Sequence, residues 1–219
     1  MSIVDVEKVS LRIGQTQILR GVDLRLERGT ICGLVGRNGS GKTMLMKCIS
    51  GFIRPTAGRI TVMGQELGRE MDFPPSMGII LETPAFIPYY SGFRNLCLLA
   101  GLRRVAGPEE VRTAMEQVGL DPALRRPVGK YSLGMRQRLG IAQAIMEKPE
   151  LLILDEPMNG LDNSGVEETR RLLLRLRGEG KTILLASHHQ EDISRLCDQV
   201  FQMDGGVLTK VEEAVEPDG

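Results

Sequence analysis

Hydrophobic and polar residues alternate along the first thirty positions of the chain. From Ile3 to Thr30 the apolar residues fall mostly at every second position, which is the period of a strand with one buried face. Gly14 and Gly21 interrupt this alternation, and glycine readily adopts the backbone angles of a tight turn. The pattern therefore predicts short antiparallel strands, with turns at Gly14 and near Gly21.

Short apolar runs and helical segments follow one another in the rest of the chain. Strands are predicted at 31–35, 58–63 and 77–81, and buried strands at 151–154 and 182–186. Helices are predicted at 42–49 and, after a capping box at Ser164–Glu167, as far as Gly178. A hairpin is predicted where Asp204-Gly205-Gly206 joins strands at 200–203 and 207–210. This alternation, with an antiparallel edge and a helical insertion, predicts an α/β fold.

The helical insertion runs from Tyr89 to Lys148, where apolar residues recur at three-to-four spacing. Ten basic and five acidic residues occur in this segment. Two interpretations stay open: a solvated helical face, or a surface that meets phosphates, acidic loops or lipid headgroups.

Charge and composition exclude several classes of protein. The 219 residues hold 28 basic and 28 acidic side chains, and a net charge of zero argues against a dedicated nucleic-acid binder. No apolar run approaches the roughly 20 residues that span a bilayer, and Met1–Arg12 is too polar for a signal peptide. The four cysteines lack C-x-x-C spacing, so we expect core-filling thiols. These features predict a soluble cytosolic chain that can dock on a membrane protein.

A glycine-rich phosphate loop is the strongest motif. Gly36–Thr43 matches G-x-x-x-x-G-K-[ST], with a predicted strand before it and a predicted helix after it. The glycines let backbone N–H groups approach phosphates, and the helix N-terminus adds partial positive charge. Lys42 is expected to reach the β- and γ-phosphates, and the Thr43 hydroxyl to bind Mg²⁺. Nucleotide binding follows, but the loop alone does not choose among kinases, GTPases, motors and transport ATPases.

A second part of the site is predicted where the apolar strand 151–154 runs into two acids. Asp155 can present a carboxylate to Mg²⁺, usually through water. Glu156 can polarise a water for in-line attack on the γ-phosphate. An apolar strand ending in acids is common by itself and becomes specific only downstream of a phosphate loop.

Six motifs in a fixed order resemble those of the ATP-binding-cassette (ABC) family. They are the phosphate loop, the Q-loop position at Glu82, the signature Tyr131–Met135, Asp155-Glu156, the D-loop Asn159–Asp162 and the switch histidine in Ser187-His188. In finer detail, Ile79–Pro84 and the signature are similar to bacterial exporters of peptide antibiotics, of the bacitracin and lantibiotic type. The resemblance covers Ile3 to about Lys210.

The resemblance implies a P-loop NTPase (RecA-like) core with an N-terminal antiparallel β subdomain and an inserted α-helical subdomain. One ATPase domain would fill 1–219. Its implied parts are a catalytic core at 1–88 and 149–211, a helical subdomain with the signature at 89–148, and a flexible tail at 212–219.

The resemblance also assigns roles to residues, with ATP and Mg²⁺ as the bound groups. Glu156, His188 and Glu82 would be catalytic, and Thr43, Glu82 and Asp155 would serve the metal. ATP would be bound by Ile13, Gly36, Arg37, Asn38, Gly39, Ser40, Gly41, Lys42, Thr43 and Met44. The nucleotide of the opposite subunit would meet Tyr131, Ser132, Leu133, Gly134 and Met135, and Asp162 would carry contacts across the dimer. His189 is expected to be a bystander.

Several residues depart from the family pattern. Ile13 stands where an aromatic normally stacks on adenine, and residues 1–51 hold no aromatic, so either Ile13 or the Arg12 guanidinium would cover the base. Glu82 replaces the commoner glutamine; it can still bind Mg²⁺, or it merely faces solvent. Leu133 and Met135 replace a signature glycine and glutamine. Arg94 stands where the related exporters tend to have an acid.

The leading interpretation is the ATPase subunit of an exporter, working with a separate integral membrane permease and a second cassette, identical or not. It would act in the cytoplasm, peripheral on the inner face of the cell membrane, without nucleic acid. The alternative is a non-transport ABC ATPase, a scaffold or assembly ATPase. A kinase is disfavoured because no acceptor site is recognisable, and a GTPase because N-K-x-D is missing.

Overall fold

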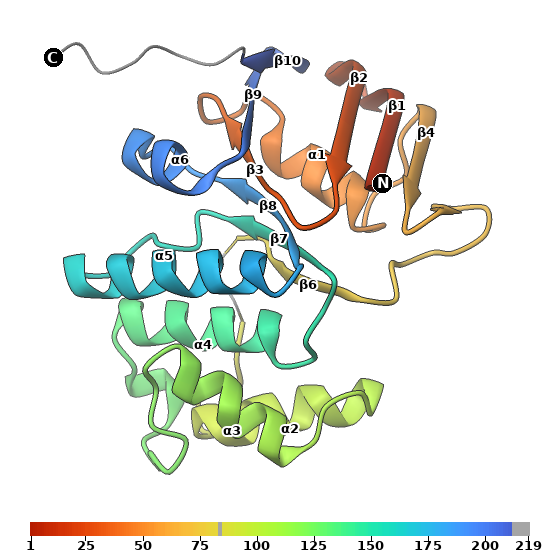
Figure 1. The fold of residues 1–219 in the computed structure, drawn as a ribbon. Helices are drawn as coiled ribbons and strands as arrows, with labels where there is room; N and C mark the ends of the chain where they lie inside the picture. Colours follow the sequence, from red (N-terminus) through yellow and green to blue (C-terminus); the bar gives the residue numbers. More distant parts are fainter. Residues whose placement is uncertain (83–84, 212–219) are drawn as a thin grey trace, which may run out of the picture. The chain divides into compact units, whose positions relative to one another are not determined.

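The computed structural model describes residues 1–82 and 85–211, which form two compact units (Figure 1). The first unit combines Met1–Pro75 with the described residues from Thr182 onward, and the second is Ser76–Lys181. Thr83 and Pro84 of the exporter-like segment, and the tail expected at 212–219, lie outside the described residues. The expected subdomain boundaries at 88/89 and 148/149 stay a prediction.

An antiparallel sheet forms one part of the first unit. Its strands are β1 (Ser2–Ile13), β2 (Thr16–Glu27), β4 (Ala57–Val62) and β5 (Gln65–Glu66), in the order β2-β1-β4-β5. The sequence alternation buries one face of β1, with side chains such as Val4, Val6 and Leu11 almost fully covered. Apolar burial on this face holds the sheet to its register.

The turn predicted at Gly14 joins β1 to β2, but the turn predicted near Gly21 is wrong. Gly21 lies inside β2 with a φ of 61°. The pairing of β1 with β2 shifts register between Val9 and Leu11, and the Gly21 N–H donates to the Ser10 hydroxyl at 2.9 Å. The glycine therefore supports a β-bulge in one long strand and does not reverse the chain.

A second sheet of the first unit contains β10 (Val207–Val211), β9 (Gln199–Asp204), β3 (Ile31–Val35) and β8 (Thr182–Ala186), in that order. The β3 strand runs parallel to β8 and β9, and β9 and β10 form the predicted hairpin. All five residues of β8 are buried, as expected for an interior parallel strand. Helices α1 (Lys42–Ile49) and α6 (Gln190–Leu196) complete this unit.

The second unit pairs two parallel strands with helices. Its strands are β6 (Met77–Ile80) and β7 (Leu151–Asp155). Its helices are α2 (Gly92–Arg103), α3 (Pro108–Gln117), the 3-10 turn η1 (Val128–Lys130), α4 (Leu133–Ile145) and α5 (Asn163–Gly178). In the residues that the structure describes, no helix is long and apolar enough to cross a membrane.

Side-chain caps fix where the main helices of the second unit begin. Ser91 caps α2 and Ser132 caps α4, each accepting a backbone N–H three residues ahead. The α5 helix begins two residues earlier than a Ser164 cap would place it, because Asp162 accepts the Gly165 N–H at 3.0 Å. The capping box predicted at Ser164–Glu167 is therefore replaced by an Asp162 cap.

The four cysteines behave as core thiols and not as reactive groups. Cys32 and Cys48 are buried, Cys97 and Cys197 are partly covered, and all four are free. Burial raises the pKa of the Cys48 thiol to about 11. Burial and the charges of Asp198 and Asp192 raise that of Cys197 to about 12. Thiols of this kind stay protonated and poorly nucleophilic near neutral pH.

A close approach of helix α4 to strand β6 gives a test of this packing. A Cβ at Gly78 would overlap the Ala144 carbonyl and meet Leu152 Cδ2 at 2.8 Å. We expect Gly78→Ala to destabilise the protein by about 1–3 kcal/mol, because backbone atoms must move. Denaturation in urea measures the loss.

Gly101→Ala is the matched control, because this helical glycine has no atom within 4 Å of an added Cβ. It should stabilise the protein by about 0.5–1 kcal/mol. Equal urea midpoints for the two variants would contradict the close packing of α4 on β6.

Candidate functional site

The phosphate loop joins β3 to α1, as the sequence predicts. Gly41, with a φ of 116°, occupies the N-cap of α1, and the first helical turn contains no acidic residue. Gly36 has a φ of 149°, and a Cβ there would collide with the Met203 carbonyl of β9. Glycine is thus required at this position because the loop lies directly on a neighbouring strand. The geometry leaves the positive end of α1 available to an anion.

Lys42 is folded back over this loop. Its ammonium donates to the Gly36 carbonyl at 2.6 Å and to the Arg37 carbonyl at 3.2 Å, and the side chain is largely buried. An ammonium has three donors, so one remains for another acceptor. The two loop carbonyls therefore hold the Lys42 side chain in place over the loop.

The Ser40 hydroxyl is a second polar group of the loop with bonding capacity left over. Its hydroxyl oxygen is buried and has no hydrogen-bond partner among the described residues. An unsatisfied buried hydroxyl costs about 1–3 kcal/mol, so such atoms are usually partnered. Thr43 and Met44 lie half-buried on α1, while Arg37, Asn38 and Gly39 are exposed on the loop. The loop has the donors and the shape that a phosphate group needs.

His188 follows β8 and is exposed, with its ring centroid 4.0 Å from that of His189. Because β8 and β3 are parallel neighbours, His188 and the phosphate loop both follow carboxyl ends of the same sheet. Ligands of parallel α/β sheets bind at this edge.

The turn that carries His188 is held by two residues that the sequence analysis did not assign. The Ser187 hydroxyl donates to the Asp192 carboxylate at 3.0 Å and accepts the His189 N–H at 3.1 Å. Ser187 and Asp192 are both almost fully buried. Only their spacing of five residues around the histidines could have indicated this contact.

The carboxylates of the second unit follow β7. Asp155 ends the strand, and Glu156 comes next in the left-handed region with a φ of 49°; both are half-buried. Such a backbone in a residue other than glycine is strained and is often found at functional sites. This backbone conformation makes Glu156 a candidate functional residue.

Gln137 of α4 holds this strained segment. Its side-chain amide donates to the Glu156 carbonyl at 3.3 Å and to the Pro157 carbonyl at 2.9 Å. The sequence analysis did not assign Gln137, and no local pattern marks a contact across 20 residues of chain. The signature helix and the carboxylates are thus linked within the second unit.

The signature segment begins helix α4. Tyr131 is buried and its hydroxyl accepts the Gly92 N–H at 3.3 Å, whereas Ser132 is exposed at the N-cap. Gly134 and Met135 follow in the first helical turn, half-buried. An exposed helix N-terminus with a serine cap can receive an anion.

Leu133, a departure from the family pattern, lies over the D-loop. A Cβ on Gly160 would come within 2.6 Å of Leu133 Cγ, and Gly160 has a φ of 78°. The leucine thus fills space beside the D-loop glycine, two residues before the Asp162 cap of α5. The first half of the signature and the D-loop form one packed group.

Two further predicted residues lie at the edges of their units. Ile13 ends β1, is about half exposed, and pairs with Thr16 across the turn. Beside it, the Arg12 guanidinium donates to the Gln17 side chain at 3.3 Å. Glu82 follows β6, is exposed, and has a φ of 64°. The first unit therefore carries the phosphate loop, Ile13 and His188, and the second carries Asp155, Glu156, Glu82, the signature and Asp162.

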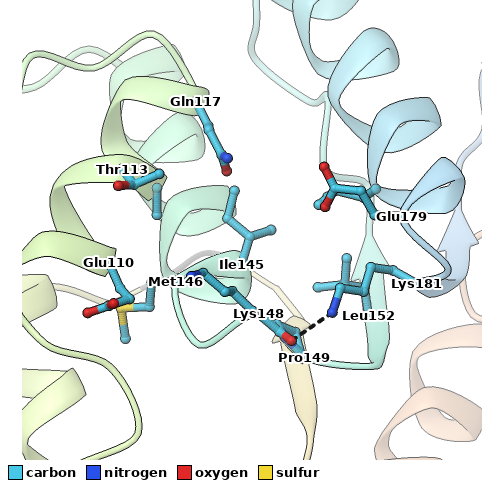
Figure 2. A pocket seen from close by; sticks show the side chains of 12 residues that line it. Glu110, Thr113, Gln117, Ile145, Met146, Lys148, Pro149, Leu152, Glu179 and Lys181 are labelled. Atoms are coloured by element: carbon cyan, nitrogen blue, oxygen red, sulfur yellow. Dashed lines mark hydrogen bonds between the residues drawn. The ribbon is translucent and has the colours of Figure 1, made fainter.

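A hollow of about 220 Å³ in the second unit does not involve these residues (Figure 2). It is lined by α3, the ends of α4 and α5, and the start of β7, and the Lys181 ammonium donates to the Lys148 carbonyl there at 2.9 Å. Leu152 lines it near the amino end of β7, whereas Asp155 ends that strand. Nucleotides bind at carboxyl ends of parallel strands, so the hollow is not assigned to one.

Comparison with known proteins places this geometry in a family. The family model described as ABC transporter matches residues 19–159. An uncharacterized ABC transporter ATP-binding protein of Bacillus subtilis is 42% identical over 97% of this chain and 98% of its own length. A bacitracin transport ATP-binding protein of Enterococcus faecalis is 40% identical over 95% of this chain and 68% of its own length. A solved ATP-binding subunit of an ABC transporter superposes with a TM-score of 0.86 at 27% identity, over 95% of this chain and 89% of that one.

The expected fold class and the resemblance to bacterial peptide-antibiotic exporters are confirmed by these similarities. This fold positions the three parts of the candidate site: the phosphate loop, the strained carboxylate turn and the capped signature helix. This chain belongs to the ABC transporter family.

Proposed function

We propose that this chain is the ATP-binding and ATP-hydrolysing subunit of an ABC exporter, that it dimerises around ATP, and that it drives a separate membrane permease. The observation that carries the proposal is the phosphate loop. It presents a bent-back Lys42 ammonium, an unpartnered buried Ser40 hydroxyl and the free positive end of α1. All three features are satisfied by one triphosphate.

Mg²⁺ is the metal that the family implies, and the donor set fits it. The Thr43 hydroxyl and the Asp155 carboxylate are hard oxygen groups, and Glu82 offers another. Mg²⁺ typically takes only one or two protein carboxylates and completes its shell with water and phosphate oxygens. When bound, the metal would neutralise charge on the β- and γ-phosphates.

Hydrolysis would use Glu156 as the base. Its carboxylate would accept a proton as a water attacks the γ-phosphorus, and ADP would leave as the bond to the β-phosphate oxygen breaks. The Gln137 amide donates to the carbonyl of Glu156, whose backbone is left-handed, and this contact would help to hold the base in position. His188 would donate a hydrogen bond to the γ-phosphate and help hold the water.

We expect Glu156→Gln to slow ATP hydrolysis by roughly 10²- to 10⁴-fold, because an amide cannot accept the proton. ATP binding should survive, so the variant should accumulate as an ATP-bound dimer. Phosphate release and size-exclusion chromatography with Mg-ATP measure the two effects. Glu109→Gln, on the exposed start of α3, is the control and should hydrolyse normally. Wild-type turnover in Glu156→Gln would remove Glu156 as the base.

The signature would complete the site of a second subunit. Ser132 is exposed at the start of α4, where its hydroxyl and the helix N-terminus could meet the γ-phosphate held by the partner. ATP would then join two subunits, and ADP, without the γ-phosphate, could not. Binding and hydrolysis would thus switch the dimer between two states.

Ser132→Asp separates this contact from the capping role of the residue. Aspartate caps a helix as well as serine does, so stability should change by less than about 0.5 kcal/mol. Its carboxylate would repel the triphosphate, so ATP-dependent dimerisation should be lost while the monomer still binds ATP. Analytical ultracentrifugation in a Glu156→Gln background measures whether ATP still produces a dimer. An intact ATP-dependent dimer would contradict the sandwich.

Base recognition would rest on Ile13, since no aromatic precedes the phosphate loop. Base stacking on an aromatic is worth about 1–3 kcal/mol in single-stranded nucleic-acid binders. Ile13→Tyr should therefore tighten ATP binding by roughly 5- to 150-fold. Isothermal titration with ATP and GTP measures this gain. Arg12→Ala tests whether the neighbouring guanidinium covers the base, and unchanged affinity in Ile13→Tyr would show that the base lies elsewhere.

The permease, the second cassette and the location on the inner face of the membrane remain parts of this proposal. A relative named for bacitracin transport supports a peptide-antibiotic exporter. Co-purification of a multi-span membrane protein with this chain in detergent tests the assignment. A soluble nucleic-acid complex in its place would favour a non-transport ATPase.

A further inference from the structure

The turn of the β9–β10 hairpin (blue in Figure 1) is hydrogen-bonded to the phosphate loop. Gly206 is buried in this turn, and its backbone N–H donates to the Ser40 carbonyl at 3.0 Å. The Gly206 carbonyl in turn accepts the Arg20 N–H of β2 at 2.8 Å. One residue of the hairpin is therefore bonded both to the loop and to a strand of the antiparallel sheet.

Gly206 has no room for a side chain. Its φ is 83°, and an added Cβ would collide with the Ile18 carbonyl of β2. The neighbouring Gly205 also has a left-handed backbone, with a φ of 52°, but it is exposed and no atom lies within 4 Å of an added Cβ. The turn conformation favours glycine at both positions, whereas close packing requires it only at 206.

The same hairpin contacts both ends of the phosphate loop. The Met203 carbonyl lies where a Cβ of Gly36 would be, and Met203 Sδ lies 3.7 Å from an added Cβ on Gly41. Strand β9 pairs with β3 as far as Val35, directly before the loop. Met203 and Gly206 together therefore contact the beginning, the middle and the end of the loop.

The hydrogen bond from Gly206 sets the direction of a donor on the loop. The Ser40 carbonyl and the Gly41 N–H belong to one peptide group, and in a trans peptide they point in opposite directions. Gly41 is the N-cap of α1, and the first N–H groups of a helix have no partner within it. A Ser40 carbonyl that Gly206 holds thus keeps the Gly41 N–H turned away from the hairpin. If this peptide turned over, it would present a carbonyl oxygen where phosphate needs a donor.

We propose that Gly206 is a positioning residue for nucleotide binding, because its N–H holds the Ser40–Gly41 peptide in the orientation that a phosphate can use. This inference rests on the proposed function and adds to it a residue of the hairpin, which touches no nucleotide. Backbone N–H groups of such a loop meet the α- and β-phosphates, which ATP and ADP share. Gly206 should therefore affect the binding of both nucleotides equally and leave the hydrolytic step unchanged.

Titration of the full chain with Mg²⁺ and fluorescent mant-ADP tests this role. Gly206→Ala should weaken binding by roughly 2- to 13-fold, which corresponds to the net value of one hydrogen bond. In steady-state hydrolysis the KM for ATP should rise by the same factor while kcat stays nearly unchanged. Gly205→Ala is the matched control, since it has the left-handed strain without the collision, and it should bind as wild type. Equal affinities of the two variants would overturn the proposal.

A second control separates this role from a general loss of stability. Gly58 of β4 has a φ of 87°, and a Cβ there would collide with the backbone of Glu7 and Lys8. Gly58→Ala therefore combines the same strain with the same kind of collision in the same unit, without a contact to the phosphate loop. It should keep wild-type affinity for mant-ADP. An equal loss of affinity in Gly58→Ala and Gly206→Ala would assign the effect to stability and overturn the proposal.

An ester in place of the peptide bond between Gly205 and Gly206 tests the hydrogen bond itself. It replaces the N–H by oxygen and adds no side chain, so it avoids the collision. Cys197 allows residues 1–196, made as a thioester, to be joined to a synthetic peptide of residues 197–219 before refolding. The ester should weaken binding by roughly the same 2- to 13-fold relative to the all-amide chain made in the same way. Equal affinity of the ester and the all-amide chain would overturn the proposal even if Gly206→Ala does not fold.

These outcomes are separable from those of the proposed function, because mant-ADP binding needs neither hydrolysis nor a dimer. Weaker binding in the position 206 variants of a protein that hydrolyses no ATP would leave this inference standing and reject the hydrolytic function. ATP hydrolysis with unchanged affinities in these variants would do the reverse. A wild type that binds no nucleotide would reject both.

Discussion

The need to hold concentrated negative charge with few cations dominates the first unit. The phosphate loop meets it with backbone N–H groups, one lysine and a helix N-terminus, and such groups gather only if the backbone is tightly curved. Gly36 can curve there because it has no Cβ to strike the Met203 carbonyl of β9. The order of the sheet, which brings β9 beside β3, is therefore a condition for the shape of the loop.

A similar constraint applies to the carboxylates of the second unit. A carboxylate that accepts a proton from water beside a phosphate must be fixed, because a mobile carboxylate would move away from the negative charge. The Glu156 backbone is held in a left-handed conformation by amide contacts from Gln137, a residue of the signature helix. Any movement of α4 would therefore displace the Glu156 backbone. In the proposed mechanism, a second subunit that engages the signature would influence the proposed base Glu156 through this contact, without touching it.

The sequence predicted those features that depend on neighbours in the chain. The strand at 182–186, the helix at 42–49 and the phosphate loop between strand and helix follow from local pattern and agree with the structure. Features that depend on distant residues were missed or misread. Gly21 fits the pattern of a turn, but its pairing with β1 makes it part of a bulge. Ser164 fits the pattern of a helix cap, but Asp162 caps the helix by accepting the Gly165 N–H. Gln137 carries no local signal, because its partner Pro157 lies 20 residues further along the chain. The Ser187–Asp192 contact spans only five residues and was missed because this pair belongs to no recognised motif.

The excess of positive charge in the helical segment is another feature that the sequence alone could not interpret. A count of ten basic and five acidic residues cannot distinguish a solvated face from a binding surface. The structure separates them by partner: Arg103 and Arg138 form 2.6 Å ion pairs with Glu147 and Glu168, so they serve the fold. Arg94 and Arg104 lie instead at the ends of a helix whose apolar side chains face water. Arg94 stacks on the Tyr90 ring and Arg104 is the C-cap of α2, so the positive charges of this segment have different structural surroundings that a count cannot show.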